Sequence, residues 1–128
     1  MRALLDTHTL LWWMGGDRRL SKTAKALIAD PANPILVSAA SAWEIATKVR
    51  KGKLPGAEGL AADLPGQIAE QAFDTLSITL SHAQRAGSLP GPLLDPFDRM
   101  LIAQAQEENL PVIGLDRAFD AYRVRRLW

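Results

Sequence analysis

The feature that most constrains the fold is a series of short apolar runs, several of which end at a polar residue. Runs of this length suit strands that are buried on both faces, which is the pattern of a parallel sheet. The runs span residues 3–5, 34–38, 76–78, 111–115 and 124–128. The run at 76–78 is the weakest, and we expect the last one to lie at a sheet edge.

Longer segments with helical periodicity separate these runs. Ser21 is a candidate N-cap for one helix, and Asp95, followed by a proline, begins the strongest helix, which we expect to run to about Asn109. Residues 60–73 predict a further helix, weakened in its first part by a Pro-Gly pair. Another apolar stripe, ended by Gly52, consists of Ala42, Ile45, Ala46 and Val49. The alternation predicts an α/β fold with three layers, in which helices flank a central, mostly parallel sheet of about five strands.

Length and composition restrict the class of protein. The 128 residues suit one domain, spanning 1–128, because two would each be too small to bury a good core. A net charge of +1 excludes a histone-like polycation, and the lack of cysteine excludes a disulfide framework or a thiolate metal site. No apolar run approaches the roughly 20 residues of a membrane helix. Asp6 comes too early for a signal peptide, so we expect a cytoplasmic location.

Acidic residues cluster where a parallel sheet would bind a ligand. Ligands of such sheets bind beyond the carboxyl ends of the strands, where the N-termini of helices also point. Asp6 directly follows the first run, and Asp116 directly follows the run at 111–115. Glu44 lies early in the helix after the second run, and Asp98 lies in the first turn of the helix that Asp95 begins.

Most of these acids also have a purely structural interpretation. Asp6, Asp95 and Asp116 suit helix caps or turns. Glu44 follows Ser41 at the spacing of a capping box and precedes Lys48 by four residues, which favours an ion pair along the helix. It also lies opposite the apolar stripe of its helix, so periodicity alone predicts that it faces solvent.

Asp98 is harder to explain in this way. It falls within the apolar face of its helix, where a carboxylate is costly unless it is paired or bound to a cation. That face consists of Phe97, Leu101, Ile102 and Ala105. Four converging carboxylates would repel one another and raise each other's pKa unless a divalent cation neutralised them. Oxygen-only ligands favour Mg²⁺ or Mn²⁺, which suits hydrolysis of a phosphodiester.

Longer strings of residues resemble a known family, the PIN-domain proteins. The resemblance covers nearly the whole chain, at residues 4–13, 38–54, 95–105 and 111–128, and the second and third segments are the most specific. Within the family the chain is most similar to VapC-type toxins of toxin–antitoxin pairs. The resemblance implies a metal-dependent endoribonuclease that uses Mg²⁺ or Mn²⁺.

The resemblance also implies a role for each acid. Asp6 and Asp98 would be the principal metal ligands. Asp116 would be a further ligand or would hold a metal-bound water, and Glu44 would be a ligand or would orient that water. Supporting roles would fall to Thr7, through its hydroxyl or amide, and to Asp95, as a helix cap. The family often has threonine or serine two residues before its last acid, where this chain has Gly114. That departure puts a second metal position in doubt.

Cationic and aromatic residues suggest partners. Candidate contacts to RNA phosphates are Lys48, Lys51, Arg99 and Arg117, although a solvated basic face is the more frequent explanation for any one such cluster. Trp12, Trp13 and Trp43 suit base stacking or, more commonly, packing in a core or interface. A VapC-like toxin would need such a surface for a homodimer and for its antitoxin. His8 is a weak candidate for a general base, and His82 suits a surface or capping position.

Other functions fit the sequence less well. A haloacid-dehalogenase-like phosphatase also has an aspartate after its first strand, but it requires a second aspartate where this chain has His8. A receiver domain requires paired acids after its first strand and a lysine after its last. An inactive PIN-like protein that only binds partners is the remaining alternative, and Gly114 is the one feature in its favour.

Overall fold

A computed structural model describes residues 1–128 and contains one five-stranded sheet. Its strands are β1 (Ala3–Leu5), β2 (Ile35–Ser38), β3 (Asp74–Leu76), β4 (Val112–Ile113) and β5 (Arg126–Leu127). They lie in the order β3-β2-β1-β4-β5, and every neighbouring pair is parallel. The predicted α/β fold is confirmed, including the position of the last strand at an edge.

Seven α-helices and one 3₁₀ helix connect the strands. They are α1 (Thr7–Gly15), α2 (Lys22–Ala29), α3 (Ala39–Arg50), α4 (Glu58–Ala62), α5 (Leu64–Glu70), α6 (Leu80–Ser88), α7 (Pro96–Glu107) and η1 (Arg117–Tyr122). The hydroxyl of Ser21 accepts a hydrogen bond from the Ala24 amide, which confirms its predicted capping role. None of the helices is both long enough and apolar enough to cross a bilayer.

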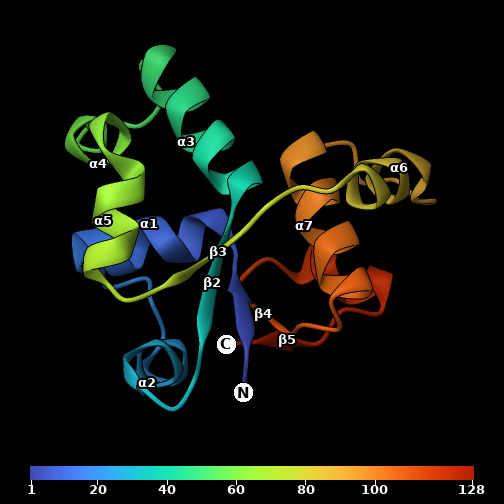
Figure 1. Cartoon of the computed structure of the whole chain (residues 1–128), viewed down its shortest axis with the longest axis horizontal. Helices are drawn as coiled ribbons and strands as arrows, with labels where there is room; N and C mark the ends of the chain where they lie inside the picture. The colour runs from blue at the N-terminus through green and yellow to red at the C-terminus, as the bar shows by residue number, and fades with distance from the viewer.

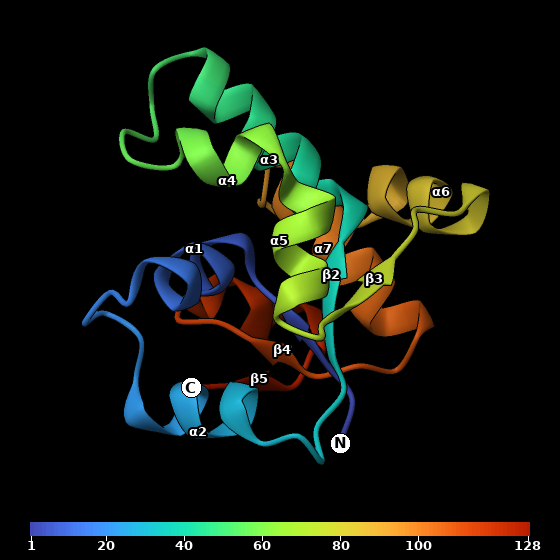
Figure 2. The same cartoon turned by 60° about the vertical axis from the view of Figure 1, so that its left-hand side comes forward.

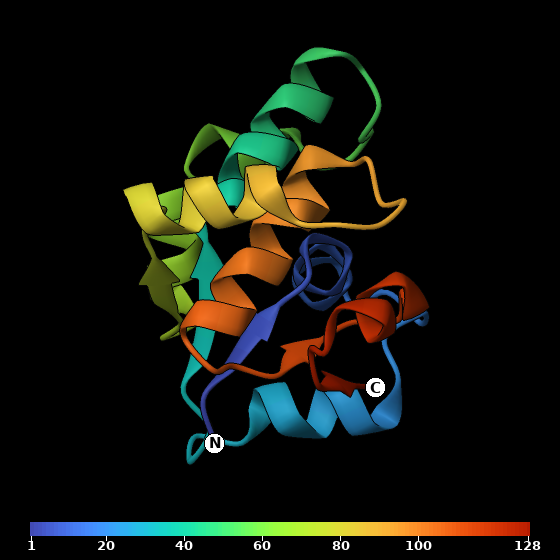
Figure 3. The same ribbon diagram turned by 90° about the vertical axis from the view of Figure 1, so that its right-hand side faces the viewer.

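The sheet separates two apolar cores, because successive side chains of a strand point to opposite faces. Ala3 and Leu5 of β1 belong to the core beneath α1, α2 and α5, whereas Leu4 between them belongs to the core beneath α7 and η1. Figures 1 and 2 show α1, α2 and α5 on one side of the sheet, and Figure 3 shows α6 and α7 on the other. This arrangement confirms the three predicted layers.

Two local expectations were wrong. Residues 60–73 do not form one helix, because the chain breaks at Asp63 between α4 and α5. The Asp63 carboxylate accepts a hydrogen bond from the Gly66 amide and caps the second helix. The weak strand lies two residues earlier than predicted, at Asp74–Leu76, and Ile78 is outside it.

Candidate active site

Asp6 lies at the end of the central strand β1. Its backbone amide donates to the carbonyl of Ile113 on the neighbouring strand (3.0 Å), which fixes the residue between the ends of β1 and β4. Asp6 occupies the N-cap position of α1, yet its carboxylate accepts no capping hydrogen bond. Only 3% of the residue is exposed. The structure therefore holds a buried carboxylate at the N-terminus of a helix and does not use it as a cap.

Gly114 lies directly against Asp6. A Cβ atom added to Gly114 would lie 3.0 Å from the Cβ of Asp6 and 3.6 Å from its Oδ2. The first distance is shorter than ordinary van der Waals contact, so a side chain at residue 114 would require Asp6 to shift by a few tenths of an ångström. The absence of a side chain at residue 114 therefore leaves room beside Asp6.

Glu44 is buried, contrary to the expectation that it faces solvent. It is 3% exposed, even though it lies opposite the apolar stripe that includes Ile45. The expectation failed because α3 is covered on two sides: it packs against α1 and also against α7. The Glu44 carboxylate forms the predicted ion pair with Lys48, but its second oxygen, Oε1, is buried without any hydrogen-bond partner.

The predicted capping box between Ser41 and Glu44 does not form. The helix begins earlier, and Ser38 is its N-cap, with a hydroxyl that accepts a hydrogen bond from the Ala40 amide. Ser41 instead pairs its hydroxyl with that of Thr7 (2.8 Å), and both side chains are buried. Thr7 therefore joins the starts of α1 and α3 next to Asp6 and Glu44.

Asp95 and Asp98 begin α7 and have different roles. Asp95 is the predicted N-cap: its Oδ1 accepts hydrogen bonds from the amides of Phe97 (2.8 Å) and Asp98 (3.2 Å). Burial first, and then the negative charges of Asp95, Asp6, Glu44 and Asp116, together raise the pKa of Asp98 from its ordinary value to about 7. The charges of all the predicted site acids therefore act on the Asp98 carboxyl.

Asp116 is the outermost of these acids. It is exposed and caps η1, with its Oδ1 accepting a hydrogen bond from the Ala118 amide (2.9 Å). This confirms the structural interpretation of Asp116 as a cap. Its second oxygen, Oδ2, takes no part in that bond.

The four acids form an electrostatic cluster rather than a closed ligand shell. No three His, Asp or Glu side chains stand close enough together to hold a metal ion as they are placed. The chemistry of the donors nevertheless fits a hard divalent cation, because all are carboxylate oxygens and one, Glu44 Oε1, is buried without a partner. The mutual repulsion felt by Asp98 is the charge imbalance that such a cation would relieve.

The four candidate RNA contacts lie in different environments. The ammonium of Lys48 is already paired with Glu44. The Arg99 guanidinium donates hydrogen bonds to backbone carbonyls, including those of Ala86 (2.9 Å), Leu89 (2.6 Å) and Leu93 (2.8 Å). Through these hydrogen bonds Arg99 connects the first turn of α7 to the end of α6 and to the segment that follows α6. This structural role was not predicted from the sequence. Lys51 and Arg117 are exposed and form no ion pair.

The two histidines differ in exposure. His8 is mostly exposed, and its Nδ1 lies 3.8 Å from Oδ2 of Asp6; the interaction with Asp6 raises the pKa of His8. His82 is 1% exposed, so the expected surface position was wrong and the capping interpretation is confirmed. It completes a capping box with Thr79, and its Nε2 donates to Glu108 (2.8 Å).

Sequence reasoning also missed a buried hydrogen bond beneath the site. Ser38 donates its hydroxyl proton to Oε1 of Gln104 (2.5 Å), and Gln104 donates to the carbonyl of Ser77 (3.3 Å). Gln104 is fully buried in α7. A glutamine inside the apolar segment 101–105 was the available signal, since buried polar groups require partners.

Comparison with known proteins identifies the fold. The PIN domain family model matches residues 3–125. The chain belongs to the PIN-domain family. The match spans the segments that carry Asp6, Glu44, Asp98 and Asp116.

Individual relatives of this PIN domain are VapC proteins or toxin–antitoxin complexes. Ribonuclease VapC16 of Mycobacterium tuberculosis is 39% identical over 74 residues, a match that spans 56% of this chain and 52% of that protein. The match therefore covers about half the length of that relative. A toxin–antitoxin complex from Klebsiella pneumoniae is similar in structure, with a TM-score of 0.63 and 26% identity over 93% of this chain and 90% of that one.

Two further solved structures share the fold at lower identity. VapBC2 from Rickettsia felis, bound to a DNA fragment from its promoter, has a TM-score of 0.69 and 14% identity over 100% of both chains. VapC20 of Mycobacterium tuberculosis, a toxin that cleaves the sarcin-ricin loop, has a TM-score of 0.70 and 16% identity over 95% of both. These two show the fold alone.

Proposed function

We propose that this PIN domain is a metal-dependent endoribonuclease that acts as the toxin of a toxin–antitoxin pair. The observation that carries the proposal is the environment of Asp98, where burial first and then the uncompensated negative charges at the carboxyl ends of the strands raise the pKa of the carboxyl to about 7. A fold gains nothing in stability from such repulsion, so the cluster calls for a functional explanation. The ribonuclease name of the VapC16 relative agrees with it.

Each acid has a defined part in the proposed site. Asp6 and Asp98 are the principal ligands of Mg²⁺ or Mn²⁺, and Asp116 and the free oxygen of Glu44 complete the set. Such a cation activates water as a nucleophile and stabilises the leaving oxygen of a phosphodiester. Because the carboxylates do not yet form a closed shell, we expect binding to draw their side chains together.

The surrounding residues hold these carboxylates in position. The Asp6 amide is bonded to the strand beside it, and Thr7 and Ser41 join the two helices that carry Asp6 and Glu44. Asp95 fixes the first turn of α7 by capping it, which sets the position of Asp98. Lys48 balances one of the negative charges, so the cluster retains an excess of negative charge that a cation can neutralise.

A cognate antitoxin is the proposed protein partner, and RNA is the proposed substrate. The Klebsiella relative was solved as a toxin–antitoxin complex, which supports the antitoxin. A groove of about 670 Å³ runs between α1 and residues 54–60, beside His8 and Trp12, and suits a protein segment. Trp43, which is 59% exposed, suits a further interface, and we propose that it belongs to a homodimer contact.

The decisive test is an RNA-cleavage assay with Mg²⁺ or Mn²⁺. We expect the parent to cut RNA and Asp6→Asn and Asp98→Asn to lose at least a hundredfold in rate, on the order of the loss of one essential catalytic group. Asp74→Asn removes an exposed carboxylate on β3 and serves as the control. Cleavage by both active-site variants, or cleavage in excess EDTA, would contradict the proposal. Hydrolysis of a small phosphomonoester would instead favour a phosphatase.

Toxicity is tested separately. We expect induction of the parent chain in a bacterial host to stop growth, and co-expression of the adjacent open reading frame to restore it. The Asp98→Asn variant should not stop growth. A folded parent that binds the neighbouring gene product but neither cuts RNA nor stops growth would be an inactive PIN-like binding protein.

A further inference from the structure

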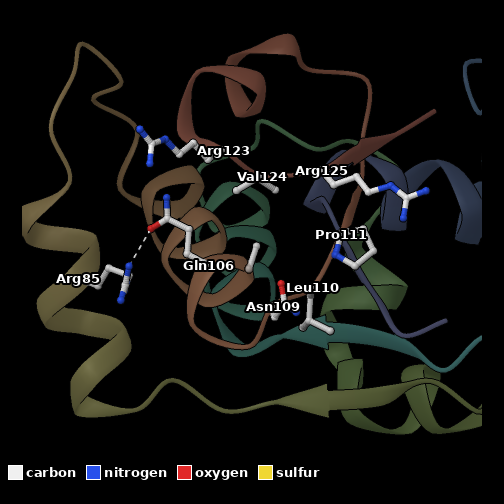
Figure 4. Close-up of a pocket in the computed structure, with 9 residues that line it drawn as sticks. Arg85, Gln106, Asn109, Leu110, Pro111, Arg123, Val124 and Arg125 are labelled. Atoms are coloured by element: carbon white, nitrogen blue, oxygen red, sulfur yellow. Dashed lines mark hydrogen bonds between the residues drawn. The ribbon is translucent and has the colours of Figure 1, made fainter.

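A second cavity lies far from the acids and carries the opposite charge. It has a volume of about 560 Å³. Its lining consists of Arg85 of α6, Gln106 of α7, the segment just before β4 and the segment just after η1. Figure 4 shows Arg123 and Arg125 on the segment that leads into β5, with Asn109 below them in this view. No acidic side chain lines it.

Its position follows from the topology of the sheet. Pro111 lines the cavity and directly precedes β4, and the amide of Val112 donates to the carbonyl of Arg125 at the start of β5 (2.9 Å). The cavity therefore lies at the amino ends of β4 and β5, whereas Asp116 follows the carboxyl end of β4. The cavity and Asp116 therefore lie at opposite ends of β4.

The arginines of the cavity differ in how far their charge is balanced. Arg85 forms an ion pair with Glu107 (3.2 Å), and its guanidinium also donates to Oε1 of Gln106 (3.1 Å). Arg123 and Arg125 are exposed and take part in no ion pair. The cavity thus holds two uncompensated charges and a third arginine whose orientation is fixed.

The distribution of these charges suits a chain of anions rather than a single one. In Figure 4, Arg85 and Arg123 lie toward one end of the cavity and Arg125 lies at the other. Val124 stands between the two unpaired arginines, and Leu110 and Pro111 form an apolar floor. Positive groups spread along the cavity in this way suit the successive anionic groups of a polymer.

We propose that this cavity binds backbone phosphates of the RNA at a distance from the point of cleavage. A guanidinium matches the geometry of a phosphate through two parallel hydrogen bonds, and its charge attracts the backbone whatever the base sequence. The choice of RNA as the polymer rests on the proposed ribonuclease function. The cavity would hold the strand that extends beyond the acidic site and so lengthen the footprint of the enzyme.

An acidic protein segment is the competing occupant, since carboxylates also bind guanidinium groups. The structure favours RNA because the unpaired charges lie apart over an open cavity and Asn109 offers an exposed amide to a sugar hydroxyl. The experiment therefore includes an acidic polymer as well as RNA.

The test uses the variant Arg123→Asn/Arg125→Gln. Asparagine is chosen at position 123 because the residue has a φ of 60°, which asparagine tolerates better than alanine. Lys22→Gln/Lys25→Gln removes the same charge from exposed positions of α2 and serves as the matched control. Thermal melts followed by circular dichroism check that both variants fold.

Binding is measured by fluorescence anisotropy of a short labelled single-stranded RNA in EDTA, which prevents metal-dependent cleavage. We expect the arginine variant to bind more weakly and its plot of log affinity against log salt to be shallower by about 1.4, or 0.7 for each lost phosphate contact. The lysine control should keep the parent's slope. An arginine variant with the parent's affinity and slope would overturn the proposal.

Two further outcomes separate this proposal from its alternatives. If the arginine variant keeps its RNA affinity but no longer binds polyglutamate that the parent binds, the cavity is a protein-binding site and the proposal fails. In the other outcome, the parent cuts no RNA with Mg²⁺, yet the arginine variant still binds RNA more weakly and with a shallower salt dependence than the parent. The proposed nuclease activity then fails while the phosphate site stands.

Discussion

Lys48 forms an ion pair with Glu44, which lies one helical turn before it, and the ammonium contacts only one of the two oxygens of this buried carboxylate. Glu44 is 3% exposed, whereas 30% of the Lys48 side chain reaches solvent. The other oxygen of Glu44, Oε1, is buried without a hydrogen-bond partner. The pair therefore fixes the Glu44 carboxylate in place and leaves one oxygen for a ligand.

We predict that Lys48→Met destabilises the protein by about 1–3 kcal/mol, because it leaves a buried carboxylate with no counter-charge. The pKa of Lys48 also points to this coupling: partial burial lowers it, but the hydrogen bond and charge of Glu44 raise it overall. Chemical denaturation of the parent and the variant measures the change. Lys51→Met, at an exposed position, should alter stability by less than about 0.5 kcal/mol.

A double variant tests whether the effect comes from the pair itself. Glu44→Gln combined with Lys48→Met removes both charges, so its loss of stability should be smaller than that of Lys48→Met alone. Equal losses in the single and double variants would contradict the role assigned to the ion pair.

The sequence was sufficient to predict the positions of Asp6 and Asp116. Both directly follow apolar runs, and the carboxyl ends of parallel strands meet at one edge of a sheet. The capping by Asp95 was predictable for a similar reason, since an N-cap depends only on its own helix. A sequence pattern predicts the position of a side chain correctly where contacts with residues nearby in the sequence determine that position.

The burial of Glu44 and the role of Arg99 depend on tertiary contacts and were not predictable in this way. A single helical projection assumes one covered face, but α3 is covered by both α1 and α7. Arg99 binds carbonyls of the segment between α6 and α7, which no charge pattern reveals. The effect of Gly114 likewise depends on the contact of β4 with β1.

Asp98 makes the stability of the metal-free protein depend on pH. Its pKa rises from 3.8 in the unfolded chain to about 7 in the folded protein, so the folded state binds the proton more tightly between these values. Stability should therefore fall as pH rises from about 4 to 7. We predict that Asp98→Asn is more stable than the parent at about pH 8, by about 1–2 kcal/mol after allowance for solvent screening.

Thermal melts in EDTA across this pH range measure the difference. The parent and Asp98→Asn should converge below about pH 4, where Asp98 is protonated in both the folded and unfolded states. Asp74→Asn, on the exposed β3 strand, should follow the parent throughout. A constant difference between the parent and Asp98→Asn at every pH would show that its titration does not control stability.

Divalent cations should stabilise the parent through the same cluster. A ligand that binds only the folded state stabilises it by about 2.7 kcal/mol at a hundredfold excess over its Kd. We expect Mg²⁺ or Mn²⁺ to raise the Tm of the parent near neutral pH and EDTA to reverse the change. Asp6→Asn and Asp98→Asn should show a much smaller rise. An equal rise in these variants would place cation binding elsewhere.

Gly114 controls how closely β4 approaches Asp6. We predict that Gly114→Ala destabilises the protein by about 1 kcal/mol, because the new methyl group would lie 3.0 Å from the Cβ of the buried Asp6, which would have to shift to accommodate it. The shift of Asp6 should also slow RNA cleavage and weaken stabilisation by Mg²⁺. Gly59→Ala in α4 adds a methyl group to open space and should be neutral or slightly stabilising. If Gly114→Ala melts like the parent and keeps its full response to Mg²⁺, the close contact with Asp6 does not shape the site.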